Sequence, residues 1–389
     1  MDFRLTEDQR ELKEAARKFA RTELPELARD MEEKDYSVPD DMMRQYGQMG
    51  FLGVNLPTQY GGLGLGHIEA LLVLEEFAQI SNAVAFPIFE ALVGPVRTIE
   101  RFGSEEMKAR ILPEVIRGES IVAVSMSEPD AGTALTDLKT NAVADGDSYI
   151  VNGYKRWTSG GGHSDYYVTY CRFNDKPGAA GIGAILLEKN AQGMQFGKRE
   201  ELMGFRGIDT ADFAIEDVRV PKKNIIVEAG GFGKLMSAFG LERCGNATQS
   251  LGVAAAALEQ ATHYVQEREA FGKPIVEFQA VQLKLAEMAM KVDAARLLIH
   301  RAASNASHQA DGLPSIYESS VAKCYANEIV REVTSMGLQV MGGYGYHKEY
   351  GMEQRLRDGF AWGIAGGTTD VQKTNIAAAL IGRRFDQRK

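Results

Sequence analysis

The chain has few cysteines and no long apolar run. Its 389 residues include three cysteines, Cys171, Cys244 and Cys324, which lie far apart and form no C-x-x-C pair. An odd, dispersed set of this kind argues against a disulfide framework or a zinc site and favours a reducing compartment. No uninterrupted apolar stretch reaches the roughly 18 residues that a membrane-spanning helix needs, so we expect no membrane association.

The amino terminus bears on the location of the protein, and the net charge bears on whether it binds nucleic acid. The first residues, MDFRLTEDQRELKEAARKF, form a charged amphipathic pattern without the apolar centre of a signal peptide, so we expect a cytoplasmic protein. A formal net charge of -9 argues against a general nucleic-acid binder, although a local basic cluster can still hold a phosphorylated ligand.

The common phosphate and metal motifs are also missing. No G-x-G-x-x-G follows an expected strand, and neither G-x-x-x-x-G-K-[ST] nor H-E-x-x-H occurs. The six histidines are scattered, and His163 and His347 lie in turn-like contexts, where we expect them to be solvated rather than catalytic. We therefore predict no metal site.

Three regions follow one another along the chain. Thr6 and Gln9 form a capping box that begins the first helix. Helical periodicity then continues at 39–49, 67–80, 87–101 and 105–117. Short β-branched and aromatic runs separated by Asp-Gly and Asn-Gly turns then indicate a compact antiparallel β domain. Long helical patterns return after Gly230, as in a four-helix bundle, at 253–268, 280–310, 315–341 and 369–381. We predict domains at 1–120, 121–228 and 229–389.

Two segments of the β region carry residues suited to a planar ligand. Ser125 to Thr133, SMSEPDAGT, places main-chain donors and hydroxyls at a strand end, and Asn152 to Gly160 contains Trp157 followed by Ser159. An ordinary turn and a core tryptophan on a hairpin are the alternatives. Together the segments resemble the acyl-CoA dehydrogenase family, although Ala134 replaces the family's usual aspartate. The resemblance implies that the flavin contacts lie at Met126, Ser127, Thr133, Trp157 and Ser159.

Segments of the carboxy-terminal region match the same family. Arg268 precedes Phe271-Gly272-Lys273 and Gln279, and a guanidinium offers a planar fork of donors to a pyrophosphate, although helix capping is the alternative. A glycine pair lets the backbone approach a phosphate closely, but it is more often only a turn. The resemblance implies FAD contacts, with the arginine and glutamine supplied by a neighbouring subunit, at Arg268, Phe271, Gln279, Gln339, Gly342, Gly343, Thr368 and Asp370.

These matches run in order from Phe3 to about Phe385, which is essentially the whole chain. The resemblance implies a helical amino-terminal domain, a middle antiparallel β domain, a four-helix bundle and a homotetramer. It also implies FAD-dependent α,β-dehydrogenation of an acyl-CoA thioester, with electrons passing to electron-transferring flavoprotein. Three alternatives stay open: a flavin-dependent acyl-CoA lyase such as a desulfinase, a cyclic-diene-forming acyl-CoA dehydrogenase, and a non-catalytic subunit of a heteromeric dehydrogenase.

The position of the catalytic carboxylate departs from the commonest family pattern. Many members carry Ile-Tyr-Glu-Gly-Thr where this chain has Ile364-Ala365-Gly366-Gly367-Thr368, so the usual base is missing. Gly366 keeps a backbone N–H that can donate to the thioester oxygen. Isovaleryl-CoA and long-chain dehydrogenases instead carry their glutamate directly before an arginine, and the pair Glu242-Arg243 matches that arrangement. We predict that Glu242 is the base; a glutamate merely paired with a cation is the alternative. Moving the carboxylate to position 366 should then restore part of the activity.

The resemblance also places substrate contacts. Arg243 matches a position near the CoA chain and Thr133 one that touches substrate, whereas Gly240 stands where many relatives have an aspartate that binds the pantetheine. Glu90 matches the floor of the acyl pocket. A carboxyl there would reject long apolar tails, and it would hold a polar tail or serve as a second base for a ring or unsaturated substrate. A solvated or ion-paired glutamate is the alternative.

Overall fold

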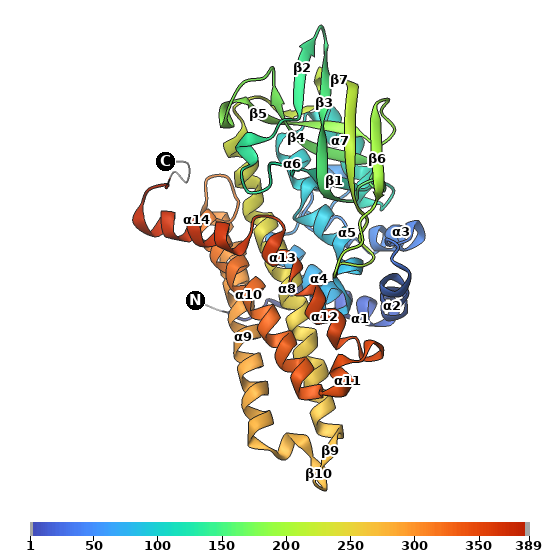
Figure 1. Ribbon diagram of the computed structural model, residues 1–389, viewed down its shortest axis with the longest axis vertical. Coiled ribbons are helices and arrows are strands. Elements are labelled where there is room, and N and C mark those ends of the chain that lie inside the picture. Colours follow the sequence, from blue (N-terminus) through green and yellow to red (C-terminus); the bar gives the residue numbers. More distant parts are fainter. Residues whose placement is uncertain (1–2, 386–389) are drawn as a thin grey trace.

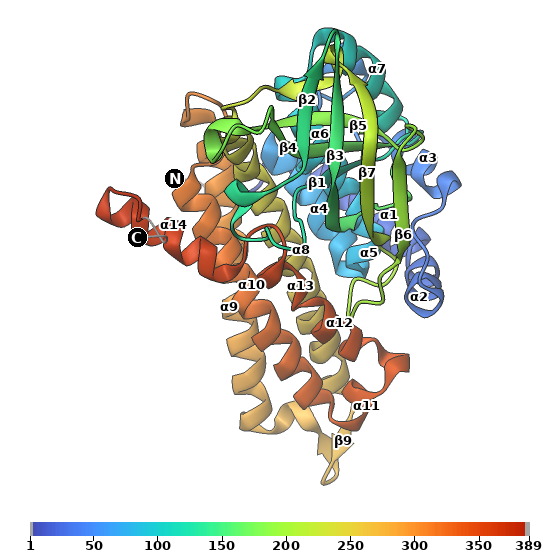
Figure 2. The ribbon, with the colours of Figure 1, turned by 45° about the horizontal axis from the view of Figure 1, so that its top comes forward.

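The computed structural model describes residues 3–385, so the outermost residues of the first and third predicted domains, 1–2 and 386–389, lie outside it. A β sheet stands at one end of the elongated molecule and three long helices extend to the other end (Figure 1). The amino-terminal helices pack against the sheet and against the part of the long helices that lies nearest to it, as the turned view also shows (Figure 2). The order of helical, β and helical regions is the predicted one.

Seven helices form the amino-terminal region: α1 (Glu7–Glu23), α2 (Pro25–Lys34), α3 (Asp40–Gln48), α4 (His67–Ile80), α5 (Asn82–Leu92), α6 (Pro95–Phe102) and α7 (Glu105–Ile116). The predicted capping box at Thr6 is present, with both reciprocal hydrogen bonds. The single helix predicted at 87–101 is wrong, because the chain breaks between α5 and α6 at Gly94. Pro95 follows as the first residue of α6, and a residue before proline is disfavoured in the helical conformation.

The middle region forms one sheet from β1 (Val122–Ser125), β2 (Asn141–Asp145), β3 (Ser148–Ser159), β4 (Tyr166–Phe173), β5 (Ile182–Glu188), β6 (Met194–Arg199), β7 (Thr210–Pro221) and β8 (Ile225–Val227). Its order is β6-β7-β3-β2-β4-β5-β8, and β1 pairs with β4. The pairing is antiparallel except that β4 runs parallel to β1 and β2. The β3–β7 register shifts between Lys155 and Thr158, which is where Trp157 adopts a left-handed backbone with φ of 62°.

The carboxy-terminal region is built on α8 (Phe232–Glu267), α9 (Gln279–Ser304) and α10 (Ile316–Met341), with α14 (Thr369–Ile381) packed against α10. The small hairpin of β9 (Glu269–Ala270) and β10 (Lys273–Pro274) joins α8 to α9. Short helices α11 (Gly343–Tyr346), α12 (Met352–Asp358) and α13 (Ala361–Ile364) link α10 to α14. Short 3₁₀ turns fall at Thr58–Tyr60, Leu135–Asp137, Ala179–Gly181, Lys222–Asn224, Ile275–Glu277, Asn305–His308 and Lys348–Tyr350.

Helix α8 begins at Phe232 and not near Val253, where the sequence pattern placed its start. Its residues from Ala238 to Ala254 are all buried, so this half of the helix has no polar face and hence no amphipathic period. Glycine lets the helix approach its neighbours closely: a Cβ at Gly252 would lie 2.5 Å from the Cβ of Ala78 in α4. The buried half of α8 therefore sits at the centre of the molecule, against α4 and α10.

The core has two parts. The larger cluster joins the amino-terminal helices, the carboxy-terminal bundle and one face of the sheet, and a smaller cluster around Tyr167, Val151 and Phe213 lies on the other face. Between residues 3 and 385, none of the helices is both long and apolar enough to span a bilayer.

Candidate active site

Two buried carboxyl groups meet at the centre of the molecule. Glu242 lies on α8 and Glu90 on α5, and each side chain belongs to a residue with only 7 % of its surface exposed. Burial raises the pKa of Glu242 to about 7, while the charges of Lys323 and Arg243 oppose that rise. Such a pKa suits a general base, because near neutral pH the group is partly ionised and still basic.

Glu90 is held in the opposite protonation state. Burial first, and then the charge of Glu242, raise the pKa of Glu90 well above its ordinary value. Two carboxyl groups close together in a dry site do not readily ionise together, so the environment favours the protonated form of Glu90 when Glu242 is ionised. The alternative of a solvated or ion-paired Glu90 is wrong: the side chain is buried, and no described residue forms a salt bridge with it.

The turn at residues 364–368 is fixed by a buried lysine. Lys323 on α10 is fully buried and donates from Nζ to the carbonyl oxygens of Ala365, Gly366 and Gly367 at 2.6, 2.6 and 2.8 Å. Burial lowers the pKa of Lys323 to about 7, and the charge of Glu242 opposes that fall. Because its three donors are directed at these carbonyls, Lys323 fixes the orientation of the whole turn.

Gly366 cannot be replaced by a side chain without strain. Its φ is 61°, in the left-handed region, and a Cβ there would lie 2.8 Å from Oδ1 of Asn246 and 3.1 Å from Nζ of Lys323. We expected a glutamate moved to position 366 to restore part of the activity, but these contacts disfavour any side chain at that position. The turn therefore has room for glycine and not for a carboxylate side chain, while the buried carboxyl of Glu242 lies on α8.

Helix α8 presents further polar groups that the sequence analysis missed. Asn246 and Gln249 follow Glu242 at intervals of four and three residues, which places the three on one face of the helix. Gln249 accepts from Nε1 of Trp362 at 2.8 Å, whereas Asn246 is fully buried with neither amide atom hydrogen-bonded by a described residue. The spacing Glu-x-x-x-Asn-x-x-Gln was the available signal.

An aromatic wall closes one side of this centre. Trp362 on α13 stacks with Phe86 of α5 at a ring-centroid distance of 6.4 Å and packs against Phe89 in a tilted geometry at 5.0 Å. Its backbone carbonyl accepts from Asn327 at 2.7 Å. These contacts tie the 361–368 segment to α5, α8 and α10, so the two glutamates and the turn form one rigid unit.

Arg243 supplies a buried cation with unused donors. It is 7 % exposed, and its Nε and Nη1 have no partner within the described residues. Unpaired buried donors are costly, so they indicate an acceptor that binds there. The family aspartate is absent from the neighbouring position for a steric reason: a Cβ at Gly240 would lie 2.5 Å from the carbonyl oxygen of Pro314.

The β-domain residues form a second group. Trp157 is 52 % exposed in its left-handed conformation, and the guanidinium of Arg156 lies 4.2 Å from its ring centroid. A bulky residue with positive φ and an exposed ring is unusual and indicates a functional constraint. Ser159 follows at the end of β3, and Met126, Ser127 and Thr133 follow the end of β1. These five side chains are half-buried or exposed, so a ligand can reach all of them.

A buried ion pair supports this surface. Lys155 is fully buried and donates from Nζ to Oε1 of Glu128 at 2.9 Å and to the carbonyl of Met126 at 3.1 Å. Glu128 also accepts from the backbone N–H groups of Lys139 and Thr140 at 2.5 and 2.9 Å. Both ends of the turn after β1 are thereby fixed, which the sequence alone did not indicate.

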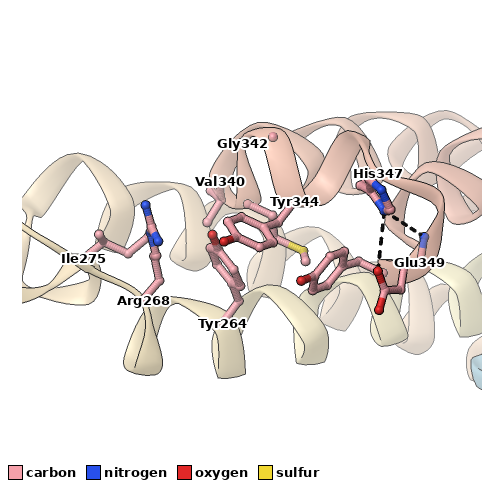
Figure 3. A pocket seen from close by; sticks show the side chains of 11 residues that line it. Tyr264, Arg268, Ile275, Val340, Gly342, Tyr344, His347 and Glu349 are labelled. Atoms are coloured by element: carbon pink, nitrogen blue, oxygen red, sulfur yellow. Dashed lines mark hydrogen bonds and ion pairs between the residues drawn. The ribbon is translucent and has the colours of Figure 1, made fainter.

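A third group lines a cavity of about 570 Å³ at the far end of the bundle (Figure 3). Arg268 and Tyr264 on α8 face the segment from Val340 to Tyr344 across it, and the guanidinium lies 5.7 Å from the ring centroid of Tyr344. A Cβ at Gly342 or Gly343 would meet nothing within 4 Å, so the backbone is open to a ligand. Phe271, Gln279 and Gln339 are exposed on the same end of the bundle.

The second group lies where the sheet meets the helices, since Gly160, next to Ser159, lines the same cavity as Glu90, whereas the third group lies at the far end of the bundle (Figure 1). An elongated ligand with an aromatic ring and a diphosphate fits their chemistry: an exposed indole and hydroxyls at one group, an arginine and an open glycine pair at the other. FAD has these parts. Thr368 caps α14 by accepting from the N–H of Val371 at 3.2 Å, and Asp370 is exposed in its first turn. No cluster of metal-ligating side chains is found between residues 3 and 385.

Fold and site together define a class: a flavoprotein built of helices and one β sheet, with a buried carboxyl group at its centre. Family models match the whole chain in three parts, described as the amino-terminal, middle and carboxy-terminal domains of acyl-CoA dehydrogenase, at residues 6–119, 123–218 and 229–381. The chain therefore belongs to the acyl-CoA dehydrogenase family of FAD-dependent oxidoreductases that dehydrogenate acyl-CoA thioesters.

Individual relatives are similar over their full length. An acryloyl-CoA reductase (NADH) of Anaerotignum propionicum is 36% identical over 98% of this chain and 97% of its own. The subunit CarC of a caffeyl-CoA reductase-Etf complex of Acetobacterium woodii is 35% identical over 97% and 99%. The solved butyryl-CoA dehydrogenase of Megasphaera elsdenii has a TM-score of 0.93 and 32% identity, covering 98% of this chain and all of that one.

Proposed function

We propose that this chain dehydrogenates an acyl-CoA thioester with Glu242 as the catalytic base. The observation that carries the proposal is the pairing of a buried, raised-pKa carboxylate on α8 with a turn in which Gly366 has no room for one. The buried carboxyl of Glu242 and the Gly366 turn, which lie within one packed unit, support this relocated site.

The chain's own residues perform three tasks in this proposal. Ionised Glu242 takes the α proton of the acyl group. The backbone N–H of Gly366, on a turn that Lys323 holds by its carbonyls, donates to the thioester oxygen as negative charge develops there. Arg243 uses its free donors to hold the CoA portion. FAD, when bound, supplies the acceptor for the hydride that leaves the β carbon.

We propose that each flavin is held by two copies of the chain. Met126, Ser127, Thr133, Trp157 and Ser159 would meet the ring system, with Thr368 and Asp370 beside them. The distal group of Arg268, Phe271, Gln279, Gln339, Gly342 and Gly343 would hold the diphosphate and adenosine of a neighbour's FAD. The separation of the groups in one chain supports this arrangement, and the homotetramer that the family resemblance implies would provide it. We place the domain limits at 1–120, 121–228 and 229–389.

The acyl group that this site favours is short and polar, or cyclic and unsaturated. A long apolar tail would bury the carboxyl of Glu90 and the free amide of Asn246 without hydrogen bonds, which is costly. The presence of a second carboxyl opposite Glu242 favours one further candidate function, removal of a proton remote from the thioester in a cyclic-diene-forming reaction.

Glu90→Ala tests the role of Glu90. We expect this variant to shift the preferred acyl group toward longer apolar chains, because it removes a buried polar group and opens space. The measurement is the rate of flavin reduction across a panel of acyl-CoA thioesters. An unchanged preference would remove Glu90 from the specificity argument and reduce it to a structural residue.

We propose electron-transferring flavoprotein as the electron partner and the cytoplasm as the location. The first rests on the relative named as part of an Etf complex, and the second on the dispersed cysteines, all three buried and free. Anaerobic mixing with the same acyl-CoA panel tests the function as a whole. Bleaching of the flavin supports the dehydrogenase; loss of a substituent without bleaching would indicate a lyase, and absence of bound flavin a non-catalytic subunit.

A further inference from the structure

A small cavity of about 30 Å³ lies between α5 and the turn that joins β3 to β4. Its polar lining comes from Glu90 on α5, from His163 and Ser164 on the turn, and from Ser37 and Asp209 on two loops. A water molecule needs roughly 10–15 Å³ of such space together with polar partners. The cavity therefore has room for one or two water molecules and the groups to hold them.

The inner end of this cavity is Glu90. The charge of Glu242 acts on Glu90, raising its pKa beyond the effect of burial. The charge of Glu90 acts in turn on Tyr167, whose pKa is raised mainly by burial. The Tyr167 hydroxyl donates to the carbonyl of Gly160 at 2.9 Å and accepts from the N–H of Gly162 at 3.0 Å. Glu90 thus lies between the catalytic base and the β3–β4 turn.

The outer end is a polar cluster that reaches the surface. Ser164 is fully buried, and its Oγ has no partner within the described residues. The side chain of His163 is 33% exposed, with Nδ1 3.4 Å from Oδ2 of Asp209, and Ser37 donates its hydroxyl to the same oxygen. An imidazole beside a carboxylate can accept a proton on one side and release it on the other.

We propose that this cavity is a water-filled proton exit that connects Glu90 to the surface at His163. The proposal rests on the assignment of Glu242 as the base. It assigns a role to His163, which we expected to be solvated, and to Ser164, for which the sequence indicated none. It also gives the free hydroxyl of Ser164 a partner, namely the cavity water.

Before reaction, in this proposal, Glu242 is ionised and Glu90 holds a proton. The α C–H bond breaks, its proton joins Glu242, and the electron pair enters the enolate that goes on to release the hydride. Glu242 is now neutral, so the smaller of the two causes that raise the pKa of Glu90, the charge of Glu242, is removed, while burial still acts on it. Glu90 then passes its proton to cavity water and, through His163, to solvent. Transfer of the remaining proton from Glu242 to Glu90 restores the starting state.

Rapid mixing of the FAD-loaded protein with acetoacetyl-CoA in weakly buffered phenol red tests the exit. This probe has acidic α protons and forms an enolate without giving up a hydride. We expect proton release to accompany binding in the wild type. His163→Leu and Ser164→Ala should slow that release at least tenfold without changing the affinity for the probe, whereas His308→Leu, an exposed histidine outside the cavity, should behave as wild type.

The outcomes separate the two proposals. Enolate formation followed by wild-type proton release in both cavity variants would overturn the exit and leave the role of Glu242 intact. A wild-type protein that binds the probe without forming an enolate would overturn the assignment of Glu242, and the exit with it. Flavin content and circular dichroism check the fold of each variant, and Ser164→Val, which fills the cavity with an apolar side chain, repeats the test if Ser164→Ala does not fold.

Discussion

At the scale of single residues, the exchange between positions 242 and 366 is the most informative feature. Gly366 has a left-handed backbone and faces the amide of Asn246, so a carboxylate cannot be added there without moving its neighbours. Glu242 enters the same region from α8, where burial and two nearby cations set its basicity. In the proposed site the catalytic carboxylate therefore comes from α8 and not from the 364–368 turn.

Glu242→Gln should retain FAD and bind acyl-CoA while flavin reduction slows by roughly three or more orders of magnitude, since the amide cannot accept the α proton. Single-turnover stopped-flow measures this rate as the loss of the oxidised flavin's absorbance at about 450 nm. Glu267→Gln is the matched control, an exposed glutamate at the other end of the same helix. Near-normal reduction by Glu242→Gln would transfer the role to Glu90 or to no base.

The rate of flavin reduction should rise with pH through about 7 and then level off. Burial raises the pKa of Glu242 to about 7, and only the ionised form takes a proton. The same shift acts oppositely on stability, because the folded state binds this proton more tightly than the unfolded state does. The contribution of Glu242 to the free energy of unfolding should therefore fall between the ordinary glutamate pKa and about 7. A pH-independent reduction rate between pH 6 and about 8 would contradict the assignment.

At the scale of elements, the 364–368 turn depends on α10. Lys323→Met should lower the reduction rate by about tenfold or more, because the turn loses three hydrogen bonds and the Gly366 N–H loses its fixed direction. Thermal unfolding should also occur at a lower temperature. Lys373→Met, which removes an exposed lysine on α14, is the control. If Lys323→Met changes only the unfolding temperature, the lysine is structural and does not position the turn.

The sequence predicted the ends of several helices well, including those of α4, although that helix is buried from Ala70 to Ala78. Most boundaries of α4, α7, α10 and α14 follow from periodicity and capping residues. The first half of α8 did not, because its buried residues carry no period, and Gly94 split a helix that looked continuous. Family motifs pointed to Glu242, Trp157 and Arg268 as candidate site residues. They could not point to Lys323, whose hydrogen bonds go to residues distant in the sequence, or to Ser164, which lines a cavity built from distant segments.

At the scale of the whole molecule, the proposed FAD contacts fall into two groups, one where the sheet meets the helices and one at the far end of the bundle. Arg268→Ala should therefore weaken flavin retention and assembly together, whereas Arg219→Ala, on an exposed part of β7, should affect neither. Analytical ultracentrifugation and the ratio of flavin to protein absorbance measure the two effects. A variant that loses FAD but stays fully assembled would restrict Arg268 to cofactor binding, and a colourless wild type that takes up no added FAD would refute the cofactor contacts.

Helix α8 carries the proposed base near its first turns and Arg268 at its carboxyl end. At about 1.5 Å per residue, the two side chains stand roughly 40 Å apart on one continuous rod. Because one residue advances a helix by about 100°, a single deletion between them would rotate one functional group away from its site while the other stayed in place. The number of residues between Glu242 and Arg268 is therefore constrained: substitutions in this part of the helix are tolerated more easily than an insertion or a deletion.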